Sequence, residues 1–242
     1  MSPLTRTAAR LPARVRRFLS PGAFVDSDHP AVIAAAARVA PGAEGAEKAV
    51  ALYREVRDGI GYCSVPPGRD ASMGAYLRDL STYRASDVLA EGHGFCVSKA
   101  ALLAALCRAS GIPARTGYAD VVNHHYSGRR LRAAMGTNVF AWHGYAELWL
   151  HDHWVKATPM FHAELCARLG VDPVDFDGRS AALLPPVDRR GAAFFSYVAQ
   201  HGSFHDVPAR YIATEIPRRH PGLDDYRHVS DPGPGSRPAP KG

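Results

Sequence analysis

Residues Glu91–Arg115 read EGHGFCVSKAALLAALCRASGIPAR and join a glycine-flanked cysteine to an apolar stretch with helical spacing. Gly92 and Gly94 permit backbone conformations that other residues avoid, so a tight turn can place Cys96 in the first turn of the following helix. The Gly-Ile-Pro sequence at 111–113 predicts where that helix ends. Because the unpaired amide groups at a helix start favour a thiolate, this position predicts a nucleophilic cysteine.

Apolar residues recur at helical spacing from Val97 to Cys107, so most of this helix is expected to be buried. Buried cysteines are commonly structural and unreactive. That interpretation suits Cys107, which lies within the apolar run and has no flanking glycines. For Cys96, local sequence alone leaves both a structural and a reactive role open.

The composition excludes several classes of protein. The chain has 242 residues and a formal charge of +6, but five arginines in the first 17 residues supply most of that excess. The remainder carries roughly +1, so we expect no nucleic-acid partner. No apolar run is long enough to cross a bilayer, so we expect no membrane partner. Four cysteines without a CxxC pair are too few for a disulfide scaffold, which predicts a cytoplasmic protein.

The distribution of charge, proline and glycine also predicts the domain organisation. Residues 1–20 are expected to be a flexible basic tail. Residues 21–221 are expected to form a single domain, since their length suits one sizeable core. Residues 222–242 are rich in proline and glycine and are expected to be disordered.

The pattern along the chain predicts an α+β fold. Helices are expected from residue 30 to 40, from about residue 45, and from 161 to 169. Strands are expected at 114–122, at 138–150 and at 154–157, the last two joined by a polar turn. Alternation in the long strand places His143 on the same face as Tyr145 and Glu147.

Three ordered segments carry a family resemblance: GFCVSKAALLAALCRASGIPAR, WHGYAELWL and HWVKATP. Together they resemble the core of the transglutaminase-like superfamily, in which a Gly-x-Cys helix start precedes a strand histidine and an aspartate that follows a Trp-Val pair. The resemblance implies helices packed on an antiparallel β-sheet, with the nucleophile at the N-terminus of a buried helix. It also implies that Cys96 attacks a carbonyl carbon while His143 accepts and later returns the proton.

The chain departs from the family pattern at Thr158, which stands where the aspartate is expected. Thr158 can accept a hydrogen bond from the imidazole but cannot neutralise its charge; loss of such a carboxylate costs a serine protease about 10⁴-fold in rate. Glu147 is four residues from His143, roughly 13 Å along a strand, and cannot substitute directly. Asp152, Asp175 and Asp177 stay open as alternatives. The predicted catalytic residues are therefore Cys96, His143 and Thr158.

Other polar residues near these segments have less specific roles. The backbone N–H of Cys96 is a candidate donor to an oxyanion. His93 and Trp142 are candidates to shape the pocket, although a turn histidine and a core aromatic are the commoner cases. His124 and His125 are candidates for the substrate entrance or for plain solvent exposure.

The sequence thus predicts a cysteine-dependent acyl-transfer enzyme, and specifically a hydrolase (a peptidase or amidase) that cleaves an amide or peptide bond through a thioester. Its expected substrate is a peptide, a protein or a small amide. The alternative is a catalytically impaired transglutaminase-like fold that binds peptides or proteins. We expect no cofactor and no metal, because neither HExxH nor CxxC accompanies the histidines. The sequence does not predict the oligomeric state.

Overall fold

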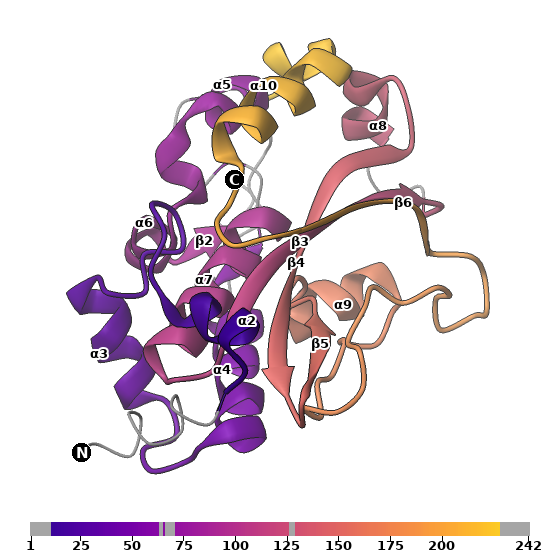
Figure 1. Ribbon diagram of the computed structural model, residues 1–242. Helices are drawn as coiled ribbons and strands as arrows, with labels where there is room; N and C mark the ends of the chain where they lie inside the picture. The colour runs from indigo at the N-terminus through magenta and orange to yellow at the C-terminus, as the bar shows by residue number, and fades with distance from the viewer. Residues whose placement is uncertain (1–10, 63–64, 66–70, 126–128, 228–242) are drawn as a thin grey trace, which may run out of the picture.

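The computed structural model describes residues 11–62, 65, 71–125 and 129–227 (Figure 1). The α-helices are α2 (Ala13–Arg16), α3 (Pro30–Arg38), α4 (Gly45–Gly59), α5 (Met73–Arg78), α6 (Ala85–Glu91), α7 (Cys96–Ala109), α8 (Arg129–Met135), α9 (Ala163–Leu169) and α10 (Ala209–Arg219). The strands are β1 (Gly61–Tyr62), β2 (His93–Gly94), β3 (Ala114–Asn123), β4 (Val139–Leu150), β5 (His153–Ala157) and β6 (Phe195–Phe204). Short 3₁₀ helices are η1 (Arg17–Leu19), η2 (Leu80–Tyr83) and η3 (Pro221–Asp224).

The main sheet contains four antiparallel strands in the order β5-β4-β3-β6. The strands expected at 114–122, 138–150 and 154–157 are present with ends within one residue of the prediction, and the mixed α+β fold is confirmed. Strand β6 was not predicted. Most of its side chains are at least partly exposed, so it carries little apolar alternation.

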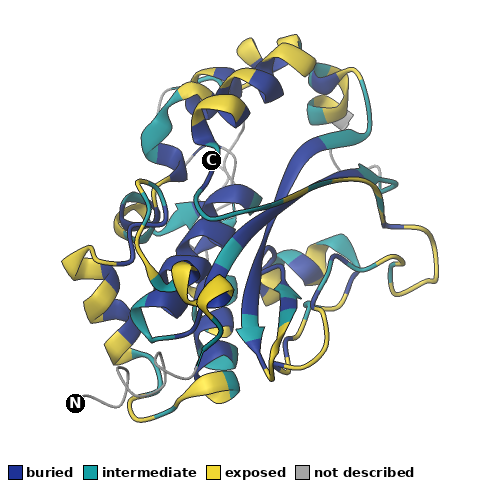
Figure 2. Ribbon diagram, viewed as in Figure 1, coloured by how far each residue is buried: buried dark blue, intermediate teal, exposed yellow. Residues whose placement is uncertain are grey.

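Helix α7 is the centre of the fold, and every residue from Val97 to Arg108 is buried (Figure 2). Its polar side chains are hydrogen-bonded inside the protein, as buried polar groups usually are. Ser98 Oγ donates to the carbonyl of Thr82 at 2.6 Å. Lys99 Nζ donates to the carbonyl of Ile60 at 2.5 Å. The predicted buried helix is therefore confirmed, and it is enclosed on all sides.

Helices α3, α4, α6 and α7 gather on one side of β3 and β4, and α9 lies on the other (Figure 1). Helix α10 packs on α5, and η3 packs on α8 and α5, so these elements form a group at one end of the sheet. The buried apolar residues form two clusters, one around α7 and one around α9 and the start of β6. Tyr62, Cys96 and Phe140 pack against both clusters, which places Cys96 between them.

Part of each predicted tail belongs to the folded body, so these two boundaries were wrong. Val15 and Phe18 are buried, and the Phe18 ring packs edge-to-face on Trp154 at 5.1 Å. At the other end Leu223 is buried within η3. These segments are polar overall, so their composition did not reveal the single apolar residues that pack into the core. Residues 1–10 and 228–242 lie outside the described residues, as does Cys63.

Two further observations concern membranes and disulfides. Among the residues that the structure describes, no helix combines the length and apolar character required to span a bilayer. Cys96, Cys107 and Cys166 are free thiols.

Candidate active site

A glycine-dependent turn places Cys96 at the first position of α7. Gly92 ends α6 with a φ of 67°, in the left-handed region that favours glycine. A Cβ added to Gly94 would lie 3.0 Å from Ser98 Cβ, so any larger residue there would require Ser98 to move. Phe95 is the N-cap and Cys96 begins the helix. The predicted tight turn and helix start are therefore confirmed.

The electrostatic environment of Cys96 favours the neutral thiol. Burial raises the pKa of Cys96 to about 11, and this effect exceeds the opposing one of the backbone N–H groups of Gly144, Val97 and Cys96 itself, which hydrogen-bond to the sulfur. The helix-start position therefore lowers the pKa, as expected, but does not make Cys96 a thiolate in the free protein. The residue as a whole is partly exposed.

Strand β4 meets the start of α7 at Gly144. A Cβ added there would lie 2.7 Å from Val97 Cα, so the strand and helix backbones pack too closely to leave room for a side chain at this position. His143 immediately precedes this contact, and Cys96 immediately precedes Val97. Cys96 and His143 also line one cavity. The structure thus brings the two predicted residues together from segments that are 47 positions apart.

The imidazole of His143 is 2% exposed and packs edge-on toward Tyr197, with ring centroids 6.0 Å apart. Burial lowers the pKa of His143 to about 3, so the ring is neutral at physiological pH. Within the described part of the chain its Nε2 atom has no hydrogen-bond partner. A neutral, unprotonated imidazole is the form that can accept a proton.

A β-bulge sits directly before His143. The pairing of β3 with β4 shifts around Asp120, and Trp142 has a φ of 58°. Asp120 Oδ1 accepts the backbone N–H of Trp142 at 3.0 Å and lies 2.6 Å from His201 Nε2. The His201 ring stacks on the Trp142 indole at 4.3 Å. These contacts hold a strained backbone residue next to the candidate base.

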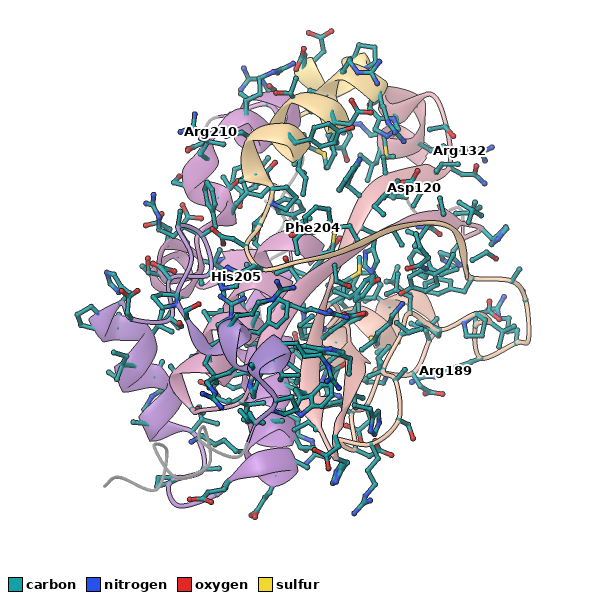
Figure 3. The ribbon with its side chains drawn as sticks, in the orientation of Figure 1. Asp120, Arg132, Arg189, Phe204, His205 and Arg210 are labelled. Atoms are coloured by element: carbon teal, nitrogen blue, oxygen red, sulfur yellow. The ribbon has the colours of Figure 1, made fainter. Side chains whose placement is uncertain are left out.

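Sequence reasoning missed Asp120 and His201. Burial opposes the ionisation of Asp120, but hydrogen bonds from His201 and the Trp142 N–H, together with Arg219, outweigh it and lower the pKa of Asp120. Figure 3 labels Asp120 on the part of the sheet nearest α8 and α10. The available signal was the carboxylate inside the otherwise apolar strand sequence TGYADVV.

Thr158 lies just beyond the end of β5 and is buried. Its backbone carbonyl accepts a hydrogen bond from the Tyr53 hydroxyl at 3.1 Å, while its Oγ1 has no hydrogen-bond partner of good geometry among the described residues. The hydroxyl of Tyr197 lies close to the Thr158 side chain. Tyr197 therefore approaches both Thr158 and His143, although no hydrogen bond joins the threonine to the imidazole in the described part.

The other carboxylates considered as partners of His143 are engaged elsewhere. Glu147 Oε2 binds Arg115 and Ser203. Asp175 pairs with Arg54 and Arg57, and Asp177 caps the backbone N–H groups of residues 179 and 180. Asp152 is exposed in the turn between β4 and β5, at the far end of the strand from His143. The acidic loop and the turn therefore do not fold back onto the imidazole.

The other histidines considered as pocket residues each contact nearby polar groups or rings. His93 Nδ1 bonds the carbonyl of Glu91, and His124 Nε2 bonds Ser196 Oγ. His125 lines the cavity that holds Cys96 and packs on Phe194. Trp142 also lines this cavity. Over the described ranges, no group of three or more His, Cys, Asp or Glu side chains is arranged to hold a metal ion.

Two comparisons with known proteins gave matches, one to a family model and one to a solved structure. The model of the transglutaminase-like superfamily matches residues 33–159, which include Cys96, His143 and Thr158. A crystal structure described as "a Putative Cysteine Protease from Cytophaga hutchinsonii" has a similar fold, with a TM-score of 0.50 and 17% sequence identity. The similarity covers 86% of this chain and 51% of that one, so this chain spans about half the length of its structural relative. No curated protein matches the sequence.

Proposed function

Because the chain belongs to the transglutaminase-like superfamily, we propose that it is a cysteine-dependent acyl-transfer enzyme and, more specifically, a hydrolase of amide or peptide bonds. One observation carries the proposal: Cys96, at the start of a buried helix, and a neutral, buried His143 line the same cavity. A thiol that is to act as a nucleophile needs a proton acceptor within reach, and a neutral imidazole supplies it.

In the proposed reaction, Cys96 Sγ forms a bond to the substrate carbonyl carbon while its proton moves to His143. The carbonyl π electrons move to the oxygen, where the backbone N–H of Cys96 is the proposed donor. Collapse of this intermediate breaks the C–N bond, and the leaving nitrogen takes the proton from His143. Water then attacks the thioester and gives a proton to His143, which returns it to the sulfur as the acid leaves.

The raised pKa of Cys96 and the lowered pKa of His143 decide how the proton moves. A stable thiolate–imidazolium pair is disfavoured by burial of both groups, so proton transfer accompanies attack on the substrate. We propose that Thr158 orients the imidazole once substrate closes the site. Without a carboxylate, the imidazolium is stabilised less than in a complete triad, and a low turnover is expected.

An activated acyl donor tests this proposal. The wild-type protein is mixed with p-nitrophenyl acetate, p-nitrophenol release is followed by absorbance, and intact mass with peptide mapping locates any acyl group. We expect a burst of p-nitrophenol and acylation of Cys96, both lost in Cys96→Ser and slowed at least about 100-fold in His143→Gln. Cys166→Ser is the matched control, because burial raises the pKa of that thiol to about 11 as well.

A second set of substrates distinguishes hydrolysis from transfer to an amine and from binding alone. Peptide amides are incubated with the protein with and without a primary amine, and products are identified by mass. Hydrolysis gives the free acid in both cases. If Cys96→Ser binds peptides as tightly as the wild type and neither protein forms an acyl adduct, the chain is a binding module and the enzymatic proposal is wrong.

A further inference from the structure

The cavity at Cys96 extends well beyond the two candidate catalytic residues. Its volume is about 270 Å³, and it reaches from Cys96 and His143 to the group formed by α8, α10 and η3. Most of the side chains that line it are aliphatic, aromatic or methionine, including Phe161 and Ile216. Among the described lining residues there is no Asp or Glu, and the one charged side chain, that of Arg132, already makes an interaction within the protein. A wall of this kind favours a neutral, largely apolar ligand.

His220 is one of the polar residues in that wall and lies at the junction of α10 and η3. The residue is only 4% exposed and lines the cavity. Its Nδ1 lies 3.1 Å from the carbonyl oxygen of Met135 at the end of α8. Its Nε2 is buried and has no hydrogen-bond partner among the described residues.

The two ring nitrogens of His220 must have different roles. A carbonyl oxygen only accepts hydrogen bonds, so Nδ1 carries the hydrogen and donates it to Met135. In the neutral ring Nε2 is then a lone-pair acceptor. A buried acceptor without a partner is uncommon in native proteins, and a ligand with a hydrogen-bond donor would satisfy this one.

We propose that this cavity binds the side of the substrate attached to the reacting carbonyl, and that this part is neutral and largely apolar and donates one N–H or O–H hydrogen bond to His220 Nε2. The proposal rests on the proposed acyl-transfer function and names its substrate class. His220 is thus a specificity-determining residue, remote from bond making and breaking. Groups of this class include phenols and the side chains of tyrosine and tryptophan.

Alkylating probes with one variable group test the preference without any turnover. Three N-(2-arylethyl)chloroacetamides carry a para hydroxyl, a para methoxy or no substituent, and a fourth carries a para carboxylate. All four present the same reactive carbon to Cys96. Only the first has the additional hydrogen-bond donor, while the methoxy compound has a similar polarity without it. Labelling of Cys96 is followed by intact mass and peptide mapping at several probe concentrations.

In the wild type we expect the hydroxyl probe to label Cys96 about 2- to 12-fold more efficiently than the methoxy probe, the range that one hydrogen bond supplies. The carboxylate probe should be at least about 10-fold slower than the unsubstituted one. His220→Asn keeps an amide N–H near the position of Nδ1, so it preserves the bond to Met135 but loses the acceptor, and the hydroxyl preference should vanish. His220→Gln restores an acceptor near the Nε2 position and should recover part of it.

Equal labelling by the hydroxyl and methoxy probes in the wild type overturns the proposal. So does a preference that persists in a folded His220→Asn protein, with folding checked by circular dichroism. If that variant does not fold, the proposal is tested by comparing the hydroxyl and methoxy probes in the wild type and in His220→Gln. The two proposals fail separately: selective labelling of Cys96 without any acylation by p-nitrophenyl acetate refutes the enzyme but leaves the pocket preference standing.

Discussion

The burial of His143 makes a quantitative prediction about stability in acid. Its pKa is lowered from 6.5 to about 3 because burial disfavours the charged ring. Between these two pH values the unfolded chain binds a proton at His143 that the folded protein does not bind. The contribution of His143 to the unfolding free energy is therefore fully present above pH 6.5 and is lost as the pH falls toward 3. One pKa unit corresponds to about 1.4 kcal/mol. From pH 7.5 to pH 4.5, His143 alone should therefore remove about 3 kcal/mol of unfolding free energy.

The assay compares the wild type with His143→Gln, which keeps a neutral polar side chain of similar size that cannot be protonated. Urea unfolding at pH 7.5, 6.0 and 4.5 gives the free energy of unfolding of each protein. We expect the variant to be less stable than the wild type at pH 7.5. As the pH falls to 4.5, the difference in unfolding free energy between the two proteins should shift in favour of the variant by about 3 kcal/mol. A difference that stays constant over this range would refute the neutral, buried imidazole and the proton-transfer route built on it.

Further predictions concern the thiol, the helix–strand contact and the bulge. The rate of Cys96 alkylation by iodoacetamide should rise about tenfold per pH unit from pH 7 to 10. The reason is that only about 10⁻⁴ of the thiol is ionised at pH 7 when its pKa is about 11. A rate that reaches a plateau below pH 8 would instead indicate a thiolate–imidazolium pair. Gly144→Ala should cost about 1–3 kcal/mol in urea unfolding, because the new Cβ would meet Val97 Cα. Asp120→Ala should lower the unfolding free energy by about 2–3 kcal/mol, because the Trp142 N–H and His201 lose a charged hydrogen-bond acceptor. An unchanged urea midpoint would contradict this prediction.

Much of the fold was predictable because local pattern and tertiary environment agree. The glycines before Cys96 predict the turn, the apolar run predicts helix α7 and the alternating pattern predicts strand β4, and each of these elements is present. Strand β6 and helix α10 escaped prediction for different reasons. In β6 most side chains are partly or fully exposed, whereas α10 contains Pro217 and ends in charged residues, which obscure its apolar face.

The sequence was sufficient to predict the candidate site residues, but it was not sufficient to predict their burial and protonation states. Helix position and strand position could be inferred for Cys96 and His143, and the family resemblance joined them. Their protonation states depend on how much of the surrounding protein excludes water, which no local pattern encodes. The bulge at Trp142 was equally hidden. Its left-handed backbone is stabilised by Asp120, 22 positions away on a different strand, so the strict alternation assumed for β4 fails there.

The missing carboxylate and the buried neutral pair are consistent with one another. In a complete triad a carboxylate stabilises the imidazolium and so raises its pKa. With Thr158 in that position nothing in the described part offsets the desolvation of His143, and its pKa falls to about 3. Replacing Thr158 by Asp should therefore raise the pKa of His143 and weaken the acid dependence of stability, provided that the new carboxylate stays ionised beside Tyr197. The test adds His143→Gln to the wild type and to Thr158→Asp, and compares how much it changes the pH dependence of the unfolding free energy in each. If the change is equally large in both, the new carboxylate does not reach the imidazole, and Thr158 is a packing residue at the end of β5.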